Sequence, residues 1–196
     1  MNIAVVDYKG GNVQSVLFAL ERLGVQATLT ADAEEIRRAN KILFPGEGEA
    51  ASAMRELRAQ GLDKLLPTLT QPFLGICLGM QLLGQHSEEN DTELLGILPF
   101  TVKRFPADAA HKVPHMGWNT LQEFRSPLFE GLREGQDHVY FVHSYYAPVG
   151  EYTIAQAQYP APFSAAVQHR NFYAVQFHTE KSGPVGTRIL ENFLNL

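Results

Sequence analysis

The fold is decided by the stretch Phe73-Leu74-Gly75-Ile76-Cys77-Leu78-Gly79-Met80-Gln81-Leu82-Leu83. Its apolar first half predicts a buried strand, and its last residues have the composition of a helix. Between them the chain must turn at Cys77, which has a glycine two residues before it and another two residues after it. Because glycine has no Cβ, the strand and the helix can approach closely and the Cys77 side chain is pushed out of the turn. This arrangement is typical of a nucleophile elbow, with cysteine in place of serine.

Cys77 is the only cysteine in the chain. It cannot form an internal disulfide, and a structural zinc site would need other ligands, so it is either a small buried apolar side chain or a reactive thiol. A thiol at a helix N-terminus lies near unpaired backbone N–H groups and the positive end of the helix dipole, which favour the thiolate. The flanking glycines favour the reactive thiol, and Cys77 is the predicted nucleophile.

Up to about residue 94, short apolar runs alternate with helical patterns. The runs predict strands at 3–6, 27–30, 41–44 and 73–76, and the patterns predict helices at 13–23 and 49–60. This alternation is typical of an α/β fold with a doubly wound, mostly parallel sheet and flanking helices.

The second half of the chain is richer in strands. Shorter β-like runs are separated by proline and glycine and lie at 100–105, 138–142, 152–158, 163–168 and 172–177. A closing helix is predicted over 184–196, with Ser182 as its N-cap. No repeat or long linker divides the 196 residues, of which 45% are hydrophobic, so we expect one domain over residues 1–196.

Charge and hydropathy limit the classes of function. The formal net charge is −5, and no basic stretch could neutralise a run of phosphates, which argues against a nucleic-acid partner. The apolar N-terminal run ends at Asp7 and is too short for a signal peptide or a membrane span. We therefore expect a cytoplasmic protein without membrane contact.

The stretch His178-Thr179-Glu180 could supply the base that a thiolate needs when it attacks an amide. In an extended chain His178 and Glu180 project to the same side, so the carboxylate could hold one ring nitrogen while the other faces Cys77. A His-x-Glu pair alone is weak evidence, because it is common at solvated strand ends. Together with the cysteine elbow it predicts a Cys77–His178–Glu180 triad.

An oxyanion formed in such a reaction needs hydrogen-bond donors. The backbone N–H of Leu78 is placed for this by the geometry of an elbow. A second donor could come from the turn Pro45-Gly46-Glu47-Gly48, since strand ends meet at one edge of a parallel sheet. That turn could equally be an ordinary connection between a strand and a helix.

Three motifs together resemble the class I (triad) glutamine amidotransferases, with their spacing along essentially the whole chain. They are Pro45-Gly46-x-Gly48, Gly75-Ile76-Cys77-Leu78-Gly79-Met80-Gln81 and Gln176-Phe177-His178-Thr179-Glu180. Further segments resemble the glutaminase subunits of imidazole glycerol phosphate synthases. These are Asp7-Tyr8-Lys9-Gly10-Gly11-Asn12 with Ser15, Pro114-His115-Met116-Gly117-Trp118-Asn119, Phe141-Val142-His143-Ser144-Tyr145 and Lys181-Ser182.

The resemblance implies an enzyme of histidine biosynthesis that hydrolyses glutamine and passes the ammonia to a (β/α)8-barrel cyclase subunit. Cys77, His178 and Glu180 would be its catalytic triad, acting without a metal or an organic cofactor. The resemblance places the glutamine and oxyanion contacts at Gly46, Gly48, Gln81, Ser144 and Tyr145. It places the partner interface at Asn12, Trp118, Tyr140 and Lys181.

Two positions depart from the pattern of this family. Thr179 stands where the family more often has proline, so the orientation of Glu180 depends more on its surroundings. Lys9 stands where the family usually has glycine, which bears on the local backbone of the interface loop. Neither residue performs chemistry in the implied mechanism.

Other functions remain open at this point. The triad would also suit a glutaminase for anthranilate or GMP synthesis, a γ-glutamyl hydrolase, or a flavodoxin-like module with Cys77 as a redox sensor. The histidine pairs at 111 and 115 and at 138 and 143 do not lie on a convincing helix, so we predict no metal site. The segment 9–12 lacks a phosphate-loop pattern. A lone tryptophan is more often core than surface, and only the resemblance places Trp118 at an interface.

Overall fold

The computed structural model describes residues 1–10, 13–106 and 111–196, and a seven-stranded sheet forms its centre. The strand order is β11-β12-β13-β4-β3-β1-β2, and the five strands from β13 to β2 run parallel while β12 and β11 are antiparallel. These strands are β1 (Ile3–Val6), β2 (Ala27–Thr30), β3 (Lys41–Gly46), β4 (Phe73–Cys77), β11 (Thr153–Gln158), β12 (Pro162–His169) and β13 (Phe172–Val175). The predicted α/β class with a mostly parallel sheet is confirmed.

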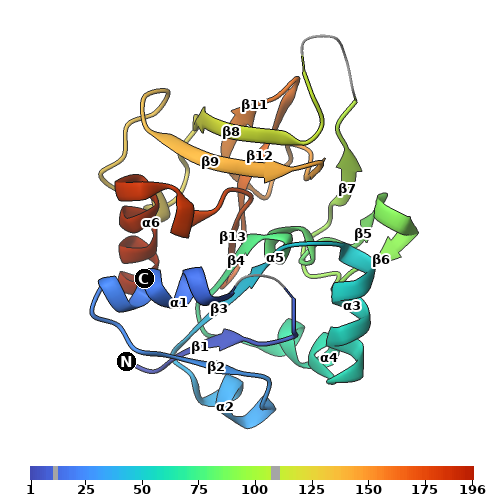
Figure 1. The fold of residues 1–196 in the computed structure, drawn as a ribbon, viewed down its shortest axis with the longest axis vertical. Coiled ribbons are helices and arrows are strands. Elements are labelled where there is room, and N and C mark those ends of the chain that lie inside the picture. Colours follow the sequence, from blue (N-terminus) through green and yellow to red (C-terminus); the bar gives the residue numbers. More distant parts are fainter. Residues whose placement is uncertain (11–12, 107–110) are drawn as a thin grey trace.

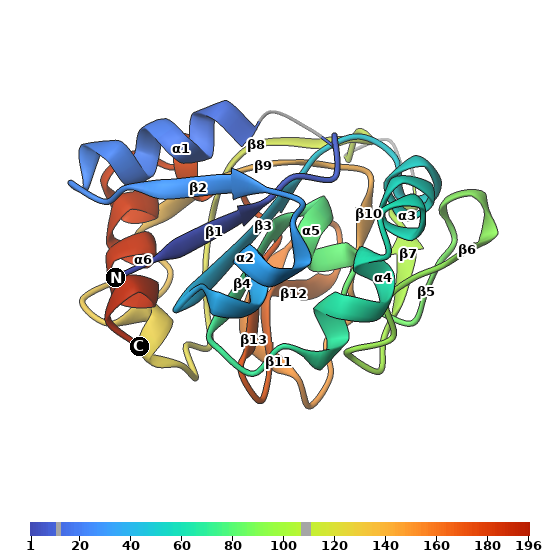
Figure 2. The ribbon, with the colours of Figure 1, turned by 90° about the horizontal axis from the view of Figure 1, so that it is seen from below.

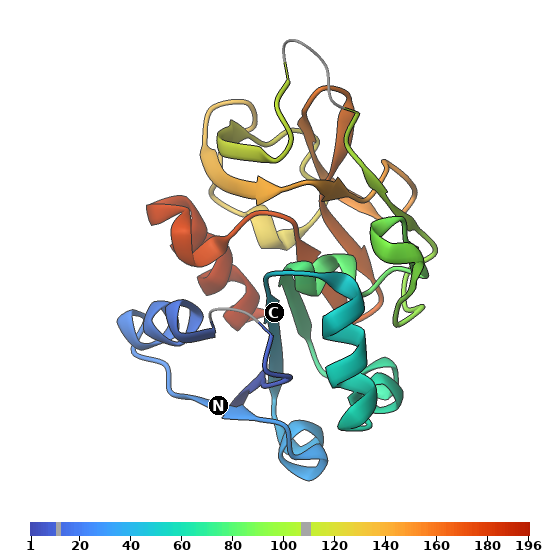
Figure 3. The same cartoon turned by 45° about the vertical axis from the view of Figure 1, so that its right-hand side comes forward.

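Helices cover both faces of this sheet. In Figures 1 and 3, α1 and α6 lie on one side of it and α3 and α4 on the other. The helices are α1 (Val13–Arg22), α2 (Ala33–Arg38), α3 (Ala50–Ala59), α4 (Leu62–Leu65), α5 (Leu78–Gln81) and α6 (Gly183–Asn195). Short 3-10 turns are η1 (Leu66–Thr68), η2 (Glu89–Asp91), η3 (Pro127–Phe129) and η4 (Thr179–Lys181).

Two smaller sheets complete the fold. The strands β5 (His86–Ser87), β6 (Thr92–Glu93), β7 (Thr101–Arg104) and β10 (Tyr145–Tyr146) form one of them. The other is an antiparallel ribbon of β8 (His115–Thr120) and β9 (His138–His143). Figure 1 shows this ribbon beyond the end of the sheet at which β4 runs into α5. The ribbon therefore lies near the end of β4 that carries Cys77.

The sheet separates two apolar clusters, and the alternation of side chains along a strand sends residues to each of them. In β1, Ala4 and Val6 join the cluster under α2, α3 and α4, whereas Ile3 and Val5 join the cluster under α1 and α6. All four side chains of β1 are buried, which is why the strand reads as one continuous apolar run. Figure 2 shows the strands between these helices from below.

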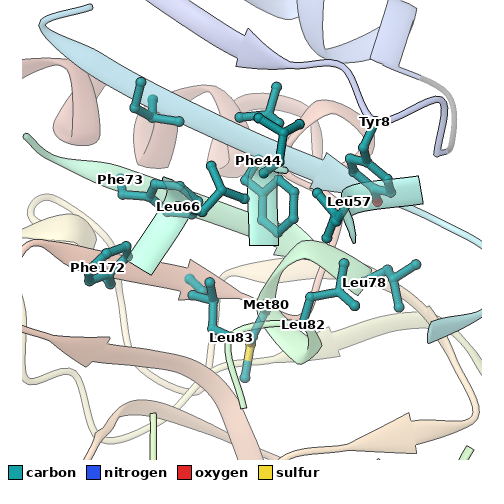
Figure 4. Packing of buried hydrophobic residues seen from close by; sticks show 14 of the residues in the cluster. Tyr8, Phe44, Leu57, Leu66, Phe73, Leu78, Met80, Leu82, Leu83 and Phe172 are labelled. Atoms are coloured by element: carbon teal, nitrogen blue, oxygen red, sulfur yellow. The ribbon is translucent and has the colours of Figure 1, made fainter. Parts of the chain in front are cut away.

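A line of aromatic rings fills the first cluster. Tyr8, Phe44, Phe73 and Phe172 follow one another with ring centroids 5.1 to 5.6 Å apart in tilted arrangements. Figure 4 shows these rings next to Leu78 and other side chains that follow the elbow. The elbow therefore rests on a packed core, which fixes its position.

The predicted strands and the helices at 13–23, 49–60 and 184–196 are present, with ends shifted by at most two residues. The short elements α2, α4, β5, β6, β8 and β10 were not predicted. Helix α2 has six residues and one buried side chain, Ile36, so it lacks a helical apolar period. Strand β8 includes Gly117 and has only one buried residue, His115. Within the described part of the chain, no helix has the length and apolar character needed to cross a membrane.

Candidate active site

The Cys77 elbow is built by strain and by close backbone packing. Cys77 ends β4 and has φ 55° and ψ −111°, a backbone conformation that residues other than glycine rarely adopt. A Cβ on Gly79 would lie 1.8 Å from the carbonyl oxygen of Phe44, and one on Gly75 would lie 2.8 Å from that of Gly79. Neither position has room for a side chain. The flanking glycines therefore allow the turn that points Cys77 outward, as the sequence predicts.

The helix after Cys77 is shorter than its composition suggests. Helix α5 is a single turn, Leu78–Gln81, whereas helical composition extended to Leu83. Such a short helix has a small dipole, so the predicted dipole effect on the thiol is reduced. The N–H of Leu78 remains available, because the first amides of a helix have no partner within it.

His178 and Glu180 are in contact, but not through the backbone that was expected. Nδ1 of His178 lies 2.8 Å from Oε1 of Glu180, and both side chains are 4% exposed. The prediction of an extended chain is wrong, because the strand ends at Val175 and residues 179–181 form η4. This tight turn brings the carboxylate back to the imidazole.

The environment of His178 favours its charged form. Burial alone would lower the pKa of His178, but the neighbouring Cys77 and Glu180 side chains outweigh burial and raise it to about 10. Nε2 of His178 is buried and has no hydrogen-bond partner among the described residues, although Cys77 is near enough to raise the pKa of the ring. An imidazole whose proton affinity is raised by a carboxylate, beside a thiol that can give it a proton, is the arrangement of an activated cysteine nucleophile.

Ser182 fixes the segment that carries His178. Its Oγ donates to the carbonyl of His178 at 2.6 Å and accepts from the N–H of Tyr140 at 2.9 Å. The N–H of His178 in turn donates to the carbonyl of Tyr140 at 3.0 Å. Ser182 precedes α6, as predicted, but its side chain makes no capping hydrogen bond there. The expected cap is replaced by a clamp between η4 and β9.

A cavity of about 400 Å³ opens in front of the thiol. Seven of the predicted residues line it: Gly48, Cys77, Leu78, Gln81, Ser144, Tyr145 and His178. Gly46 lies behind this cavity, paired with Cys77 in the sheet, and lines a smaller space with Glu180. A Cβ on Gly46 would lie 2.0 Å from the hydroxyl of Tyr8, which explains the glycine.

Several lining residues were not predicted. Glu89 reaches the cavity from η2, and its Oε2 accepts from the N–H of Ala50 at 2.8 Å. Burial raises the pKa of Glu89. Its sequence context, Glu88-Glu89-Asn90-Asp91, reads as a solvated loop and gives no signal of a pocket.

Gln176 is a second residue whose place was not predicted, although it belongs to one of the quoted motifs. It is fully buried, and its Nε2 lies 3.8 Å from Sγ of Cys77. Its Oε1 accepts from Nε2 of Gln81 at 3.0 Å. A glutamine at the end of an apolar strand was the available signal, because a buried amide needs partners.

The residues assigned to an interface lie near the cavity and partly at the surface. The side chain of Trp118 is 57% exposed, and its ring meets that of Tyr140 edge-on across the ribbon at 5.8 Å. Trp118 is therefore not core. Nζ of Lys181 lies 3.8 Å from the carboxylate of Glu47. Asn12 lies outside the described residues.

The two departures from the family pattern have visible local consequences. Lys9 has φ 60°, a left-handed conformation that glycine adopts more easily. Thr179 begins η4, and its buried hydroxyl has no hydrogen-bond partner within residues 1–10, 13–106 and 111–196.

The histidines that lie together in the structure are not the pairs that are close in sequence. His115 and His143 are opposite each other on β8 and β9, with Nδ1 and Nε2 3.1 Å apart. Among residues 1–10, 13–106 and 111–196, no three potential metal ligands gather in one place.

Comparison with known proteins agrees with this geometry. The family model "Glutamine amidotransferase class-I" matches residues 4–196. "Imidazole glycerol phosphate synthase subunit HisH" of Bacteroides thetaiotaomicron is 54% identical over 100% of both chains. The Legionella pneumophila protein "Imidazole glycerol phosphate synthase subunit HisH 2" is 50% identical over 99% of this chain and 98% of its own.

Solved structures share the fold. The crystal structure of a glutamine amidotransferase superposes with a TM-score of 0.76 at 22% sequence identity, covering 98% of this chain and 97% of that one. Because the family model spans nearly the whole sequence and these relatives share at least half of its residues, this chain belongs to the class-I glutamine amidotransferases.

Proposed function

We propose that this chain is the glutaminase subunit of an imidazole glycerol phosphate synthase of the cytoplasm, with residues 1–196 acting as one catalytic domain. The observation that carries the proposal is the buried contact of His178 with Glu180, together with the cavity that His178 lines with Cys77, the residue at the strained elbow. The relatives at 54% and 50% identity that bear this synthase's name supply the choice of pathway.

The mechanism follows from the positions of these groups. The Cys77 thiolate attacks the side-chain carboxamide carbon of glutamine, and His178 protonates the departing ammonia. A γ-glutamyl thioester remains, which a water activated by His178 hydrolyses to glutamate. The N–H of Leu78 and a donor from the Gly46–Gly48 turn hold the oxyanion, each contributing about 2.7–4 kcal/mol to transition-state stabilisation. Glu180 holds the imidazole in one orientation throughout.

The cavity can also bind the other end of glutamine. The carboxylate of Glu89 and the amide of Gln81 face the same space as Cys77 and suit an α-ammonium group. Ser144 and Tyr145 line the same cavity and offer hydroxyl donors for the α-carboxylate. Four polar residues from three separate segments would then fix the length of the substrate, which disfavours longer γ-glutamyl peptides.

The partner that we propose is a (β/α)8-barrel cyclase subunit. The relatives are named as subunits, which indicates an assembly. The ribbon exposes Met116 and Trp118, which are 63% and 57% accessible, at a site near the cavity. Exposed large apolar side chains of this kind are common at protein interfaces. Tyr140 lies opposite Trp118 on the ribbon, and Lys181 and Asn12 complete the set assigned by resemblance.

The decisive experiment is co-purification with a candidate barrel subunit, followed by measurement of ammonia release from glutamine with and without a barrel ligand. We expect low turnover for the isolated chain and an increase with the liganded partner, because free ammonia released without a partner would be lost. The glutamine analogue 6-diazo-5-oxo-L-norleucine should alkylate Cys77, and Cys77→Ser should prevent labelling. Undiminished turnover of Cys77→Ser, or faster cleavage of γ-glutamyl peptides than of glutamine, would contradict the proposal.

A further inference from the structure

Two buried histidines lie beside the cavity and take no part in the proposed chemistry. His115 and His143 are 5% and 6% exposed, on neighbouring strands of the ribbon. Nε2 of His143 lies 3.1 Å from Nδ1 of His115, and Nδ1 of His143 lies 2.7 Å from the carbonyl oxygen of Tyr145. The ring of His115 stacks on Tyr159 with centroids 4.0 Å apart. Both imidazoles are thus held in fixed positions.

The direction of this hydrogen-bond chain can be worked out from its end. A carbonyl only accepts, so Nδ1 of His143 must carry a proton and donate to Tyr145. Burial lowers the pKa of His143 to about 3 and that of His115 to about 4, so both rings are neutral at pH 7. A neutral His143 then has an unprotonated Nε2, which accepts from Nδ1 of His115. The chain therefore runs from His115 through His143 to the Tyr145 carbonyl.

The same carbonyl connects the histidines to the substrate cavity. It also accepts from Nε2 of Gln81 at 2.9 Å, and that amide nitrogen donates to Gln176 at 3.0 Å. With both amide hydrogens directed at oxygen atoms, the amide oxygen is the group that Gln81 turns towards the cavity. Tyr145 follows Ser144, and both line the cavity with Gln81.

We propose that His143, supported by His115, is a positioning residue that sets the affinity of this site for glutamine. It holds the Tyr145 carbonyl, and through it the Ser144–Tyr145 segment and the orientation of the Gln81 amide. His143 contacts the Tyr145 carbonyl, which in turn holds Gln81, whereas His178 is the residue that acts on the Cys77 thiol. This inference rests on the proposed glutaminase activity and adds residues that determine substrate binding.

The test compares His143→Leu with His143→Asn in the complex with the barrel subunit. Nδ2 of asparagine can take the place of Nδ1 and donate to Tyr145, whereas leucine has a similar size and no donor. We expect His143→Leu to raise the KM for glutamine about tenfold, the effect of losing one hydrogen bond. Its kcat should change less than about threefold, and His143→Asn should recover most of the affinity.

A second readout separates binding from the state of the thiol. Iodoacetamide alkylates Cys77 without using the glutamine contacts, so its rate should be the same in wild type and both variants. Alkylation by 6-diazo-5-oxo-L-norleucine, which uses those contacts, should slow about tenfold in His143→Leu alone. Equal KM values in all three proteins, or a fall in kcat and in iodoacetamide rate without a change in KM, would overturn the inference.

His115 provides the variant for the case in which His143→Leu does not fold, as judged by circular dichroism and thermal melting. His115→Leu removes the donor behind His143 and should raise the KM two- to threefold, and His115→Asn should restore it. An unchanged KM in His115→Leu would overturn the inference in that case. A wild-type complex that releases no ammonia from glutamine would instead overturn the proposed function itself.

Discussion

Replacement of Ser182 by alanine tests how the base-bearing segment is held in place. The Ser182 side chain is 1% exposed, and it joins η4 to β9 through its two hydrogen bonds. Alanine removes one oxygen atom and leaves the packing nearly unchanged. The perturbation therefore isolates the loss of one buried and one part-buried hydrogen bond.

The expected loss in free energy of unfolding depends on which hydrogen bonds the two former partners of Ser182 keep. The carbonyl of His178 still accepts from the N–H of Lys181 at 3.2 Å, so its loss costs about 1 kcal/mol. The N–H of Tyr140 loses its part-buried hydrogen bond to Ser182, which costs about 1–3 kcal/mol. We therefore expect the free energy of unfolding to fall by about 2–4 kcal/mol. Turnover should fall as well, because the segment that carries His178 keeps its backbone hydrogen bond to Tyr140 of β9 but loses the link through Ser182.

Urea denaturation of the isolated chain measures this change directly. Thr187→Ala is a matched control, because its hydroxyl donates to the Gly183 carbonyl at 3.1 Å in the same helix, where water can replace it. This control should lie within about 0.5 kcal/mol of wild type. If Ser182→Ala also lies within 0.5 kcal/mol of wild type, the clamp does not stabilise the site and this reasoning is refuted.

Three further changes test the remaining features of the site. Glu180→Gln keeps the shape of the side chain but removes the charge that helps to raise the pKa of His178 from 6.5 to about 10, so glutamine turnover should fall about 100-fold or more. The raised pKa of His178 stabilises the folded protein below pH 6.5, and this stabilisation is lost as the pH rises through about 10. In Glu180→Gln the pKa is raised less, so the free energy of unfolding should begin to fall at a lower pH. Urea titrations from pH 6 to 10 measure this, and identical pH profiles for the two proteins would contradict it. Thr179→Pro should raise the free energy of unfolding by about 0.4–1 kcal/mol. Residue 179 begins η4, and His178 has φ −87° and ψ 104°, angles that suit a following proline. A variant that is less stable than wild type in urea would refute this prediction. Gly79→Ala should destabilise the folded chain by about 1–3 kcal/mol and slow the alkylation of Cys77 by iodoacetamide, because the new Cβ would clash with the Phe44 carbonyl. Wild-type values in both assays would show that the elbow tolerates a side chain at this position.

Much of the fold could be predicted because its determinants are local. Strands buried on both faces appear as continuous apolar runs, as in β1 and β4, and glycines mark the turn at Cys77. The six residues of α2 were missed because a single buried side chain gives no period. The order of the strands in the sheet could not be read at all, since a run of apolar residues does not identify its neighbour.

Prediction of the site succeeded where motifs are compact and failed where contacts are long-range. The contact between His178 and Glu180 was predicted, but for an extended backbone, because the sequence does not show that a 3-10 turn begins at Thr179. Ser182 was expected to cap a helix, yet its hydroxyl binds β9 some forty residues earlier in the chain.

By itself, the sequence determined the α/β class, the elbow at Cys77 and which residue types could carry the chemistry. These properties depend on backbone sterics and on apolar periodicity within about ten residues. Only the tertiary structure decided that Glu89 lines the cavity, that Gln176 lies against the thiol and that His115 supports His143. Each of these contacts joins segments that are remote in sequence, and their approach is set by how the sheet, the ribbon and the helices pack together.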